Sequence, residues 1–273
     1  MHHAASSPVS AVVPAIPTAM PVSPPRALPA DLLARIEKAV SGAGSAEFAV
    51  DPLLGHSLSA VTSFLTSVVK RSGAVIEDAL YAALVRNRRF LVMQQVRIPI
   101  TRAAEMYVQE NGPGRVGELA LASDGATVRV GHFDMIVIDR QNQVARIVEI
   151  KRGGGETEVR KRRTTERNLL CGRLQLKAFL KTLGIPVRRC ESWVIDYYGR
   201  SGFRPELTVT REGLDQLFGV PIVATTDATA RAMRLGMLQR LPRFLDRVRE
   251  GQDVDPVVSM MRNGSPLVEA GLR

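Results

Sequence analysis

Asp134 and the tripeptide Glu149-Ile150-Lys151 are the residues of this sequence whose types and spacing could do chemistry. Alternate side chains of a β-strand share a face, so Glu149 and Lys151 point the same way while Ile150 points into the core. Asp134 precedes them by one hairpin and can reach the same edge of a sheet. Two converging carboxylates form a hard oxygen site suited to Mg²⁺ or Mn²⁺. A nearby ammonium can orient a water that attacks a phosphodiester.

This arrangement resembles the PD-(D/E)xK nuclease superfamily, whose motif is an acidic residue on one strand and E-x-K on the next. The opening Gly131-x-x-Asp134 is similar to the G-x-x-D of the RecB-like and Cas4-like branch. The segment Gln175-Leu176-Lys177-Ala178-Phe179 stands in the place of that branch's Q-h-x-x-Y helix, with Phe179 where Tyr is usual. The resemblance covers residues 73–198 and implies an α/β fold with a restriction-endonuclease-like core, in which helices flank a central mixed β-sheet.

The resemblance also implies a role for each site residue. Asp134 and Glu149 would hold Mg²⁺ or Mn²⁺, Lys151 would assist the attacking water, and Gln175 would steady the site or the strand. Members of the family often carry a further metal-binding Glu on the first core helix, and Glu77 is the candidate, although its neighbour Asp78 leaves that choice open. The expected activity is metal-dependent hydrolysis of phosphodiester bonds, of DNA in preference to RNA. A protein that keeps this fold and binds or recruits nucleic acid without cutting is the alternative.

Positive charge is concentrated around these motifs. The whole chain has a net charge of +10, and residues 140–190 alone hold 14 Lys or Arg against 4 Asp or Glu. Such a concentration suits a polyanion, because each neutralised phosphate releases condensed counterions. A solvated helix face or attraction to anionic lipid is the alternative. The residues expected to contact nucleic acid are Arg152, Arg160, Lys161, Arg162, Arg163, Arg167 and Lys177.

Aromatic and acidic residues near the motifs have two possible uses. Trp193 is expected to be buried in the sheet, whereas burial and base stacking remain equally open for Tyr197 and Tyr198. Asp139 is expected to cap the hairpin that follows it rather than to bind metal. Cys171 and Cys190 belong to no CxxC or Cys/His cluster, so the sequence predicts small buried thiols and no zinc site.

Hydrophobic periodicity predicts the elements that position these residues. Helices are expected over residues 31–40, 57–70, 74–86, 164–183, 211–218 and 226–249, the last one interrupted at Pro242. Strands are expected over residues 90–100, 127–138, 144–150 and 187–197. The order is helices, three strands, helix, strand and helix, which is typical of a mixed α/β layer fold. The Gln141-Asn142 pair suits a tight turn between the second and third strands.

The predicted organisation has four parts: a disordered Pro- and Ala-rich tail (1–28), a helical N-terminal region (29–72), the nuclease-like core (73–200) and a C-terminal helical extension (201–273). The arginines of the extension could lengthen a basic groove or bind a protein partner, and a homodimer is possible. No apolar stretch approaches the roughly 20 residues that span a bilayer, and no signal peptide is evident. The sequence therefore predicts a cytoplasmic protein that does not enter membranes.

Overall fold

The computed structural model describes residues 28–46, 48–111, 119–122 and 125–249. The predicted tail therefore lies, except for residue 28, outside the described residues. The described helices and strands follow one another as α1 (Ala30–Gly44), α2 (Gly55–Val85), β1 (Phe90–Thr101), α3 (Arg102–Asn111), β2 (Thr127–Asp139), β3 (Val144–Lys151), α4 (Val159–Thr182), β4 (Arg189–Asp196), β5 (Thr208–Thr210), α5 (Leu214–Phe218), α6 (Ile222–Arg240) and α7 (Pro242–Arg249).

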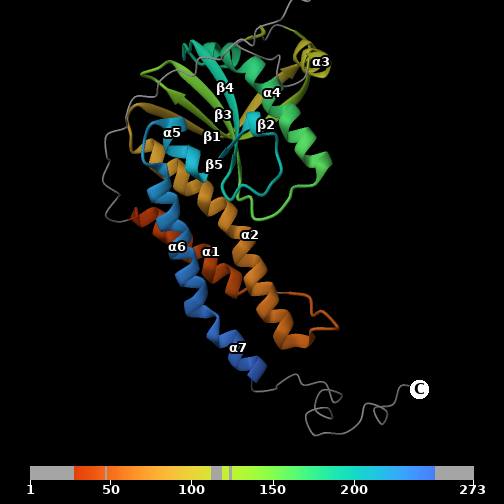
Figure 1. Cartoon of the computed structure of the whole chain (residues 1–273), viewed down its shortest axis with the longest axis vertical. Coiled ribbons are helices and arrows are strands. Elements are labelled where there is room, and N and C mark those ends of the chain that lie inside the picture. Colours follow the sequence, from red (N-terminus) through yellow and green to blue (C-terminus); the bar gives the residue numbers. More distant parts are fainter. Residues whose placement is uncertain (1–27, 47, 112–118, 123–124, 250–273) are drawn as a thin grey trace, which may run out of the picture.

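The five strands form one mixed sheet in the order β1-β2-β3-β4-β5 (Figure 1). β1, β2 and β3 pair in antiparallel fashion, whereas β4 and β5 each lie parallel to their neighbour. A parallel neighbour requires a crossover connection, and α4 supplies it between β3 and β4. The predicted α/β class with a mixed sheet is confirmed, but the structure adds α3 between β1 and β2, and β5 after β4, to the predicted order.

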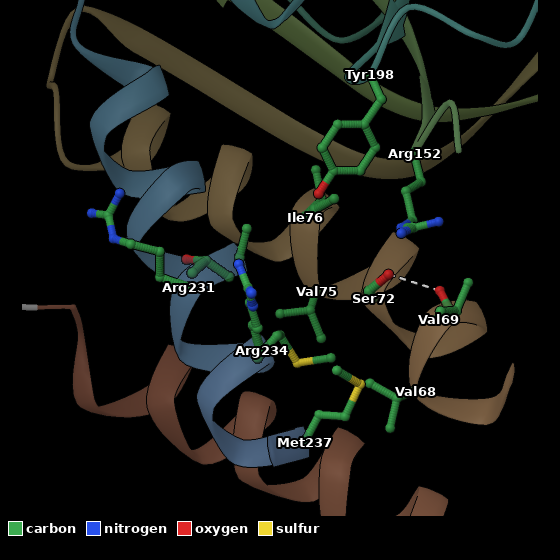
Figure 2. A pocket seen from close by; sticks show the side chains of 13 residues that line it. Val68, Val69, Ser72, Val75, Ile76, Arg152, Tyr198, Arg231, Arg234 and Met237 are labelled. Carbon is green, nitrogen blue, oxygen red and sulfur yellow. Dashed lines mark hydrogen bonds between the residues drawn. The ribbon is translucent and has the colours of Figure 1, made fainter. Parts of the chain in front are cut away.

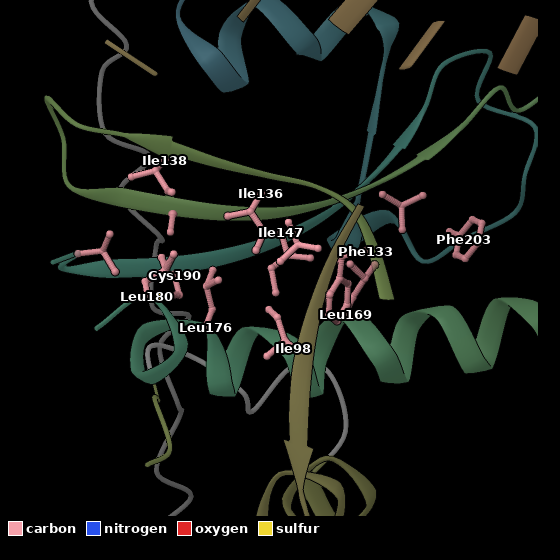
Figure 3. Close-up of a cluster of buried hydrophobic side chains, with 14 residues drawn as sticks. Ile98, Phe133, Ile136, Ile138, Ile147, Leu169, Leu176, Leu180, Cys190 and Phe203 are labelled. Carbon is pink, nitrogen blue, oxygen red and sulfur yellow. The ribbon is translucent and has the colours of Figure 1, made fainter. Parts of the chain in front are cut away.

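Apolar residues cover both faces of the sheet. On one face, Ile136 and Ile147 of the strands pack against Leu169 and Leu176 of α4 (Figure 3). On the other face, α5 and the C-terminal half of α2 cover the strands, with Leu80 of α2 completely buried. The sheet is thus the middle layer of three, and accordingly β3 is buried continuously from Val144 to Val148.

Helix α2 is longer than the sequence pattern indicates. The two predicted helices 57–70 and 74–86 form one helix of 31 residues, and the predicted domain boundary after residue 72 falls inside it. Its N-terminal half packs with α1, α6 and α7 around a second core that includes Phe64 and Phe244. Figure 1 shows these helices extending beyond the sheet. The N-terminal and C-terminal helical regions therefore share one core, and α2 connects that core to the sheet.

Gly73 lies in the middle of this continuous helix, and a Cβ added there would meet nothing within 4 Å. We expect Gly73→Ala to raise the free energy of unfolding by about 0.5–1 kcal/mol, because alanine loses less backbone entropy in a helix. Chemical denaturation of the two proteins measures this difference. Gly172→Ala in α4 is the matched contrast: its Cβ would lie 2.4 Å from the Phe133 ring, so it should destabilise. If the helix were interrupted at Gly73, Gly73→Ala would not raise the free energy of unfolding.

Other local predictions are confirmed or corrected. Asp139 caps the hairpin as predicted, since its Oδ1 accepts hydrogen bonds from the backbone N–H groups of Gln141 and Asn142, each at 3.1 Å. In the turn, Gln143 is the left-handed residue, with φ +52°, and the Asn142 side chain donates to Asp139 Oδ2. Helix α3 was not predicted from the sequence.

The predictions on Pro242 and on the two cysteines are also confirmed. Pro242 begins α7 directly after α6 ends, so the predicted interruption is confirmed. Cys171 and Cys190 are free and buried, as predicted. Among the described residues, no helix has the length and apolar character needed to cross a membrane.

Candidate active site

The sheet forks at the predicted acidic residues. The β2–β3 ladder ends at the pair Met135 and Val148, although β2 continues along β1 to Thr127. β3 likewise continues along β4 to Lys151. The next residues of the two inner strands, Asp134 and Glu149, are therefore the first beyond the fork. One hydrogen bond crosses it, from the Ile150 N–H to Asp134 Oδ2 at 2.7 Å.

The alternation of side-chain faces along β2 is interrupted at Asp134. Ile136 and Phe133 both pack on the α4 side of the sheet, whereas Met135 packs on the α2 side. The partner strand is irregular at the same level: the register passes from the pair Gln94–Met135 to the pair Val96–Phe133, and Gln95 between them has a left-handed backbone with φ +50°. Both strands are thus irregular at the point where the charge of Asp134 acts on Glu77 of α2.

Lys151 and Glu149 share a face of β3, as alternation predicts. The Lys151 ammonium donates to Glu149 Oε1 at 2.5 Å. Ile150 between them is buried in the core. The side chains of Glu149 and Lys151 are 15% and 34% exposed, so this ion pair is sheltered from solvent but accessible to a ligand at the fork.

Helix α2 brings Glu77 to the same place. Gln95 donates through Nε2 to Glu77 Oε1 at 3.0 Å, and the charges of Asp134 and Glu149 both act on the Glu77 carboxyl group. The neighbouring Asp78 turns away and pairs with Arg35 of α1 at 2.6 Å. Of these two neighbours, Glu77 is thus the one whose side chain lies beside the fork.

The three carboxylates repel one another. Burial raises the pKa of Glu149, and the charge of Asp134 raises it further, against the opposing effect of Lys151. The pKa of Glu77 is also raised, first by burial and then by Asp134. Each of the three side chains currently has a protein hydrogen-bond partner, and within the described ranges no group of three or more His, Cys, Asp or Glu is arranged to hold a metal ion. The donor chemistry nevertheless fits a hard cation. Burial and neighbouring negative charge disfavour the ionised forms of Glu77 and Glu149, and a bound divalent cation would offset that effect.

Gln175 lies apart from the carboxylates. It is buried in α4 and donates through Nε2 to Thr101 Oγ1 at 3.1 Å. Thr101 also accepts from the Ala104 N–H at the start of α3. It lies six residues beyond Gln95 on β1, about 20 Å at the usual rise of a strand. Of the two tasks expected for Gln175, this position suits steadying the strand.

The basic run occupies the start of α4, directly after the loop that leaves β3. Arg162 is paired with Glu156 at 2.8 Å, and Arg167 is paired with Glu105. Lys161 has only an exposed partner, Glu158, at 3.4 Å. Lys177 lies about 25 Å further along the helix axis than the run.

Arg160 and Arg163 are exposed, and among the described residues neither forms an ion pair. We expect the double variant Arg160→Ala, Arg163→Ala to make the dependence of log affinity for DNA on log salt shallower by about 2, because each lost phosphate contact releases one counterion fewer. Arg88→Ala, exposed before β1, is the control. Titrations at several salt concentrations measure the slope, and an unchanged slope would exclude these two residues from the contact.

Asp196 is a buried acidic residue beside the fork that the sequence analysis did not consider. It ends β4 beside Lys151 and is 2% exposed. Its Oδ2 accepts from the Ser201 N–H at 2.8 Å, whereas the buried Oδ1 has no hydrogen-bond partner among the described residues. Gly153 approaches so closely that a Cβ there would lie 1.7 Å from this oxygen. An acidic residue at the carboxyl end of the strand next to E-x-K was the available signal.

The two tyrosines that follow Asp196 have different environments. Tyr197 is 2% exposed and donates its hydroxyl to Asp227 Oδ1 at 2.6 Å, so it belongs to the core. Tyr198 is 43% exposed, and the Arg152 guanidinium lies 5.2 Å from its ring centroid. Of the two, Tyr198 is therefore the one that can stack on a ligand.

The fork thus joins one helix and three strands in a sheltered acidic site beside a lysine and a basic helix start. Comparisons of this chain with protein-family models, with curated proteins and with solved structures find no match.

Proposed function

We propose that this chain is a Mg²⁺- or Mn²⁺-dependent nuclease that hydrolyses phosphodiester bonds of DNA, built on a restriction-endonuclease-like core. The observation that carries the proposal is the fork in the sheet, where Asp134, Glu149 and Lys151 meet and Glu77 joins them from α2. These are the residues that the resemblance to the PD-(D/E)xK superfamily selects. They come from separate segments, so their convergence supports the proposal beyond the motif.

The roles follow from the contacts of each side chain. Asp134 and Glu149, with Glu77, would hold the divalent cation, which supplies Lewis-acid polarisation of the phosphodiester. Lys151 would then donate to the attacking water and to the charge that develops on the phosphate. In the structure the Lys151 ammonium neutralises Glu149, so it already lies where positive charge is needed. The exposed arginines at the start of α4 would hold the neighbouring phosphates.

Cleavage of single-stranded and duplex DNA, each linear and circular, with Mg²⁺ or Mn²⁺ tests the proposal. We expect the parent protein to cut and Asp134→Asn to lose the activity. Asparagine can still accept the Ile150 N–H, so this variant keeps the bridge across the fork while removing the charge. Equal cutting by both proteins would reject Asp134 as a ligand, and the circular substrates report whether an end is needed.

A nucleic-acid-binding protein that does not cut is the second candidate. It is favoured by the protein hydrogen-bond partner that each carboxylate now has, and by Phe179 in place of the usual Tyr. Calorimetric titration with Mn²⁺ separates the two candidates. Binding that is lost in Asp134→Asn supports the nuclease, whereas salt-sensitive DNA binding without metal binding supports the second candidate.

A further inference from the structure

A pocket of about 370 Å³ opens beside the fork, between α2, α6 and the ends of β3 and β4 (Figure 2). Its position is fixed by two chain neighbours of the site. Ile76, in its lining, precedes Glu77, and Arg152 follows Lys151. Two residues of the pocket lining are therefore direct chain neighbours of site residues.

The lining of the pocket combines an apolar floor with a cationic rim. The floor is formed by Val68, Val75, Ile76, Met233 and Met237. Arg152 and Tyr198 reach it from the sheet, and Arg231 and Arg234 come from α6 (Figure 2). No acidic side chain belongs to the lining. Such a surface suits a ligand with one flat apolar part and one anionic part.

Ion pairs do not neutralise the rim arginines. In the described part of the chain, none of Arg152, Arg231 and Arg234 forms an ion pair. Arg231 is near enough to Asp227, one turn earlier on α6, to help lower the pKa of that carboxyl group, but Asp227 already accepts from Arg211 Nε at 2.7 Å and from the Tyr197 hydroxyl. Arg152 lies over the Tyr198 ring. An external anion would therefore find unpaired guanidinium groups beside an aromatic ring.

We propose that this pocket binds one nucleotide of a single DNA strand, next to the phosphate that the fork holds. The proposal rests on the proposed function for the nature of the polymer. The base would lie on the apolar floor and against Tyr198, and its phosphate would contact Arg234 and Arg152. The volume is at the lower end of the range for small-ligand pockets, and a base inside an intact duplex cannot enter it without leaving the stack. The inferred substrate is thus a single strand or an unpaired end.

Two variants of different chemistry test the pocket. Arg234→Ala removes one rim charge from an exposed position, whereas Ser72→Trp fills the space from α2 and leaves every charge in place. Fluorescence anisotropy with a short labelled oligothymidylate and with a labelled duplex, both without divalent metal, gives the affinities. We expect each variant to weaken single-strand binding about tenfold and duplex binding less than about twofold. Circular dichroism checks that both variants are folded.

Arg249→Ala is the matched control, because it removes the same charge from an exposed helix that does not line the pocket. It should change both affinities less than about twofold. Single-strand affinity that survives both pocket variants would overturn the proposal. Equal losses for single strand and duplex would do so as well, since the arginines would then belong to a general phosphate track.

The pocket and the nuclease can fail separately. If the parent protein cuts no DNA but Ser72→Trp still weakens single-strand binding, the pocket stands and the catalytic proposal falls. If the parent protein cuts and Asp134→Asn does not, while the pocket variants bind and cut single strands like the parent, the nuclease stands and the pocket proposal falls.

Discussion

Lys151→Ala is expected to slow DNA cleavage by about 10²–10³-fold, the usual loss when one preorganised donor to a developing charge is removed. The structure gives the reason for so large an effect. The ammonium is held at the fork by Glu149 at 2.5 Å, and the Lys151 side chain is 34% exposed, so the donor is fixed in place before a substrate binds. Single-turnover cleavage with saturating Mg²⁺ measures the chemical step apart from binding and product release.

The controls for this prediction separate catalysis from binding. Lys181→Ala removes the same charge from an exposed position late in α4 and should cut like the parent. Glu149→Ala should also lose cleavage, while both site variants bind DNA with nearly the affinity of the parent. Parental rates in Lys151→Ala and Glu149→Ala would refute the site assignment.

The acidic site could be predicted from the sequence because its two main parts are local. Glu149 and Lys151 are two residues apart, and in a strand that spacing alone places them on one face. The apolar residues around Asp134 and Glu149 indicate neighbouring strands, and the short segment between them indicates a hairpin. Period-two alternation therefore identified the strands and the pair that ends them. The structure confirms the strands and brings Asp134 to the same fork.

The positions of Glu77 and Asp78 and the continuity of α2 depend on long-range packing, which the sequence pattern does not show. The selection of Glu77 over Asp78 depends on Arg35 of α1, which pairs with Asp78 and has no local signal. The sequence pattern predicts separate helices over residues 57–70 and 74–86, with Gly73, a poor helix former, between them, but the two cores that α2 joins hold this segment in one helix. Tertiary burial thus overrides local propensity, as is common for long helices.

The change of strand face at Gln95 and Asp134 was equally invisible in the sequence. Period-two alternation predicts regular strands through Gln95 and Asp134. The left-handed backbone of Gln95 and the packing of both Phe133 and Ile136 against α4 interrupt that alternation. The pocket beside the fork depends in the same way on α6, which begins 71 residues after β3 ends (222 − 151 = 71), so periodicity along the chain could not predict that the two lie together.

A divalent cation is expected to stabilise the protein, and more strongly as the pH rises. At a concentration of about 100 times its Kd, Mg²⁺ or Mn²⁺ should add about 2.7 kcal/mol, or roughly 5–10 °C in Tm for a chain of this size. The raised pKa values of Glu77 and Glu149 set the direction. The folded, metal-free protein favours their protonated forms, so it loses stability as the pH rises through these pKa values. The cation requires the ionised forms, so its contribution grows over the same interval.

Thermal unfolding with and without the cation, from about pH 5 to about pH 7.5, measures this linkage. Other groups of the protein act in the opposite direction. Arg211 lowers the pKa of Asp227, so the stability that the ionised Asp227 contributes to the folded protein is lost as the pH falls. Only a difference between variants isolates the fork. Glu149→Gln should abolish most of the metal-induced rise in Tm and flatten its pH dependence, whereas Glu110→Gln, exposed on α3, should change neither. An equal metal-induced rise in the parent and in Glu149→Gln would place the cation elsewhere, because the carboxylate that burial and Asp134 hold against ionisation would then have no part in binding it.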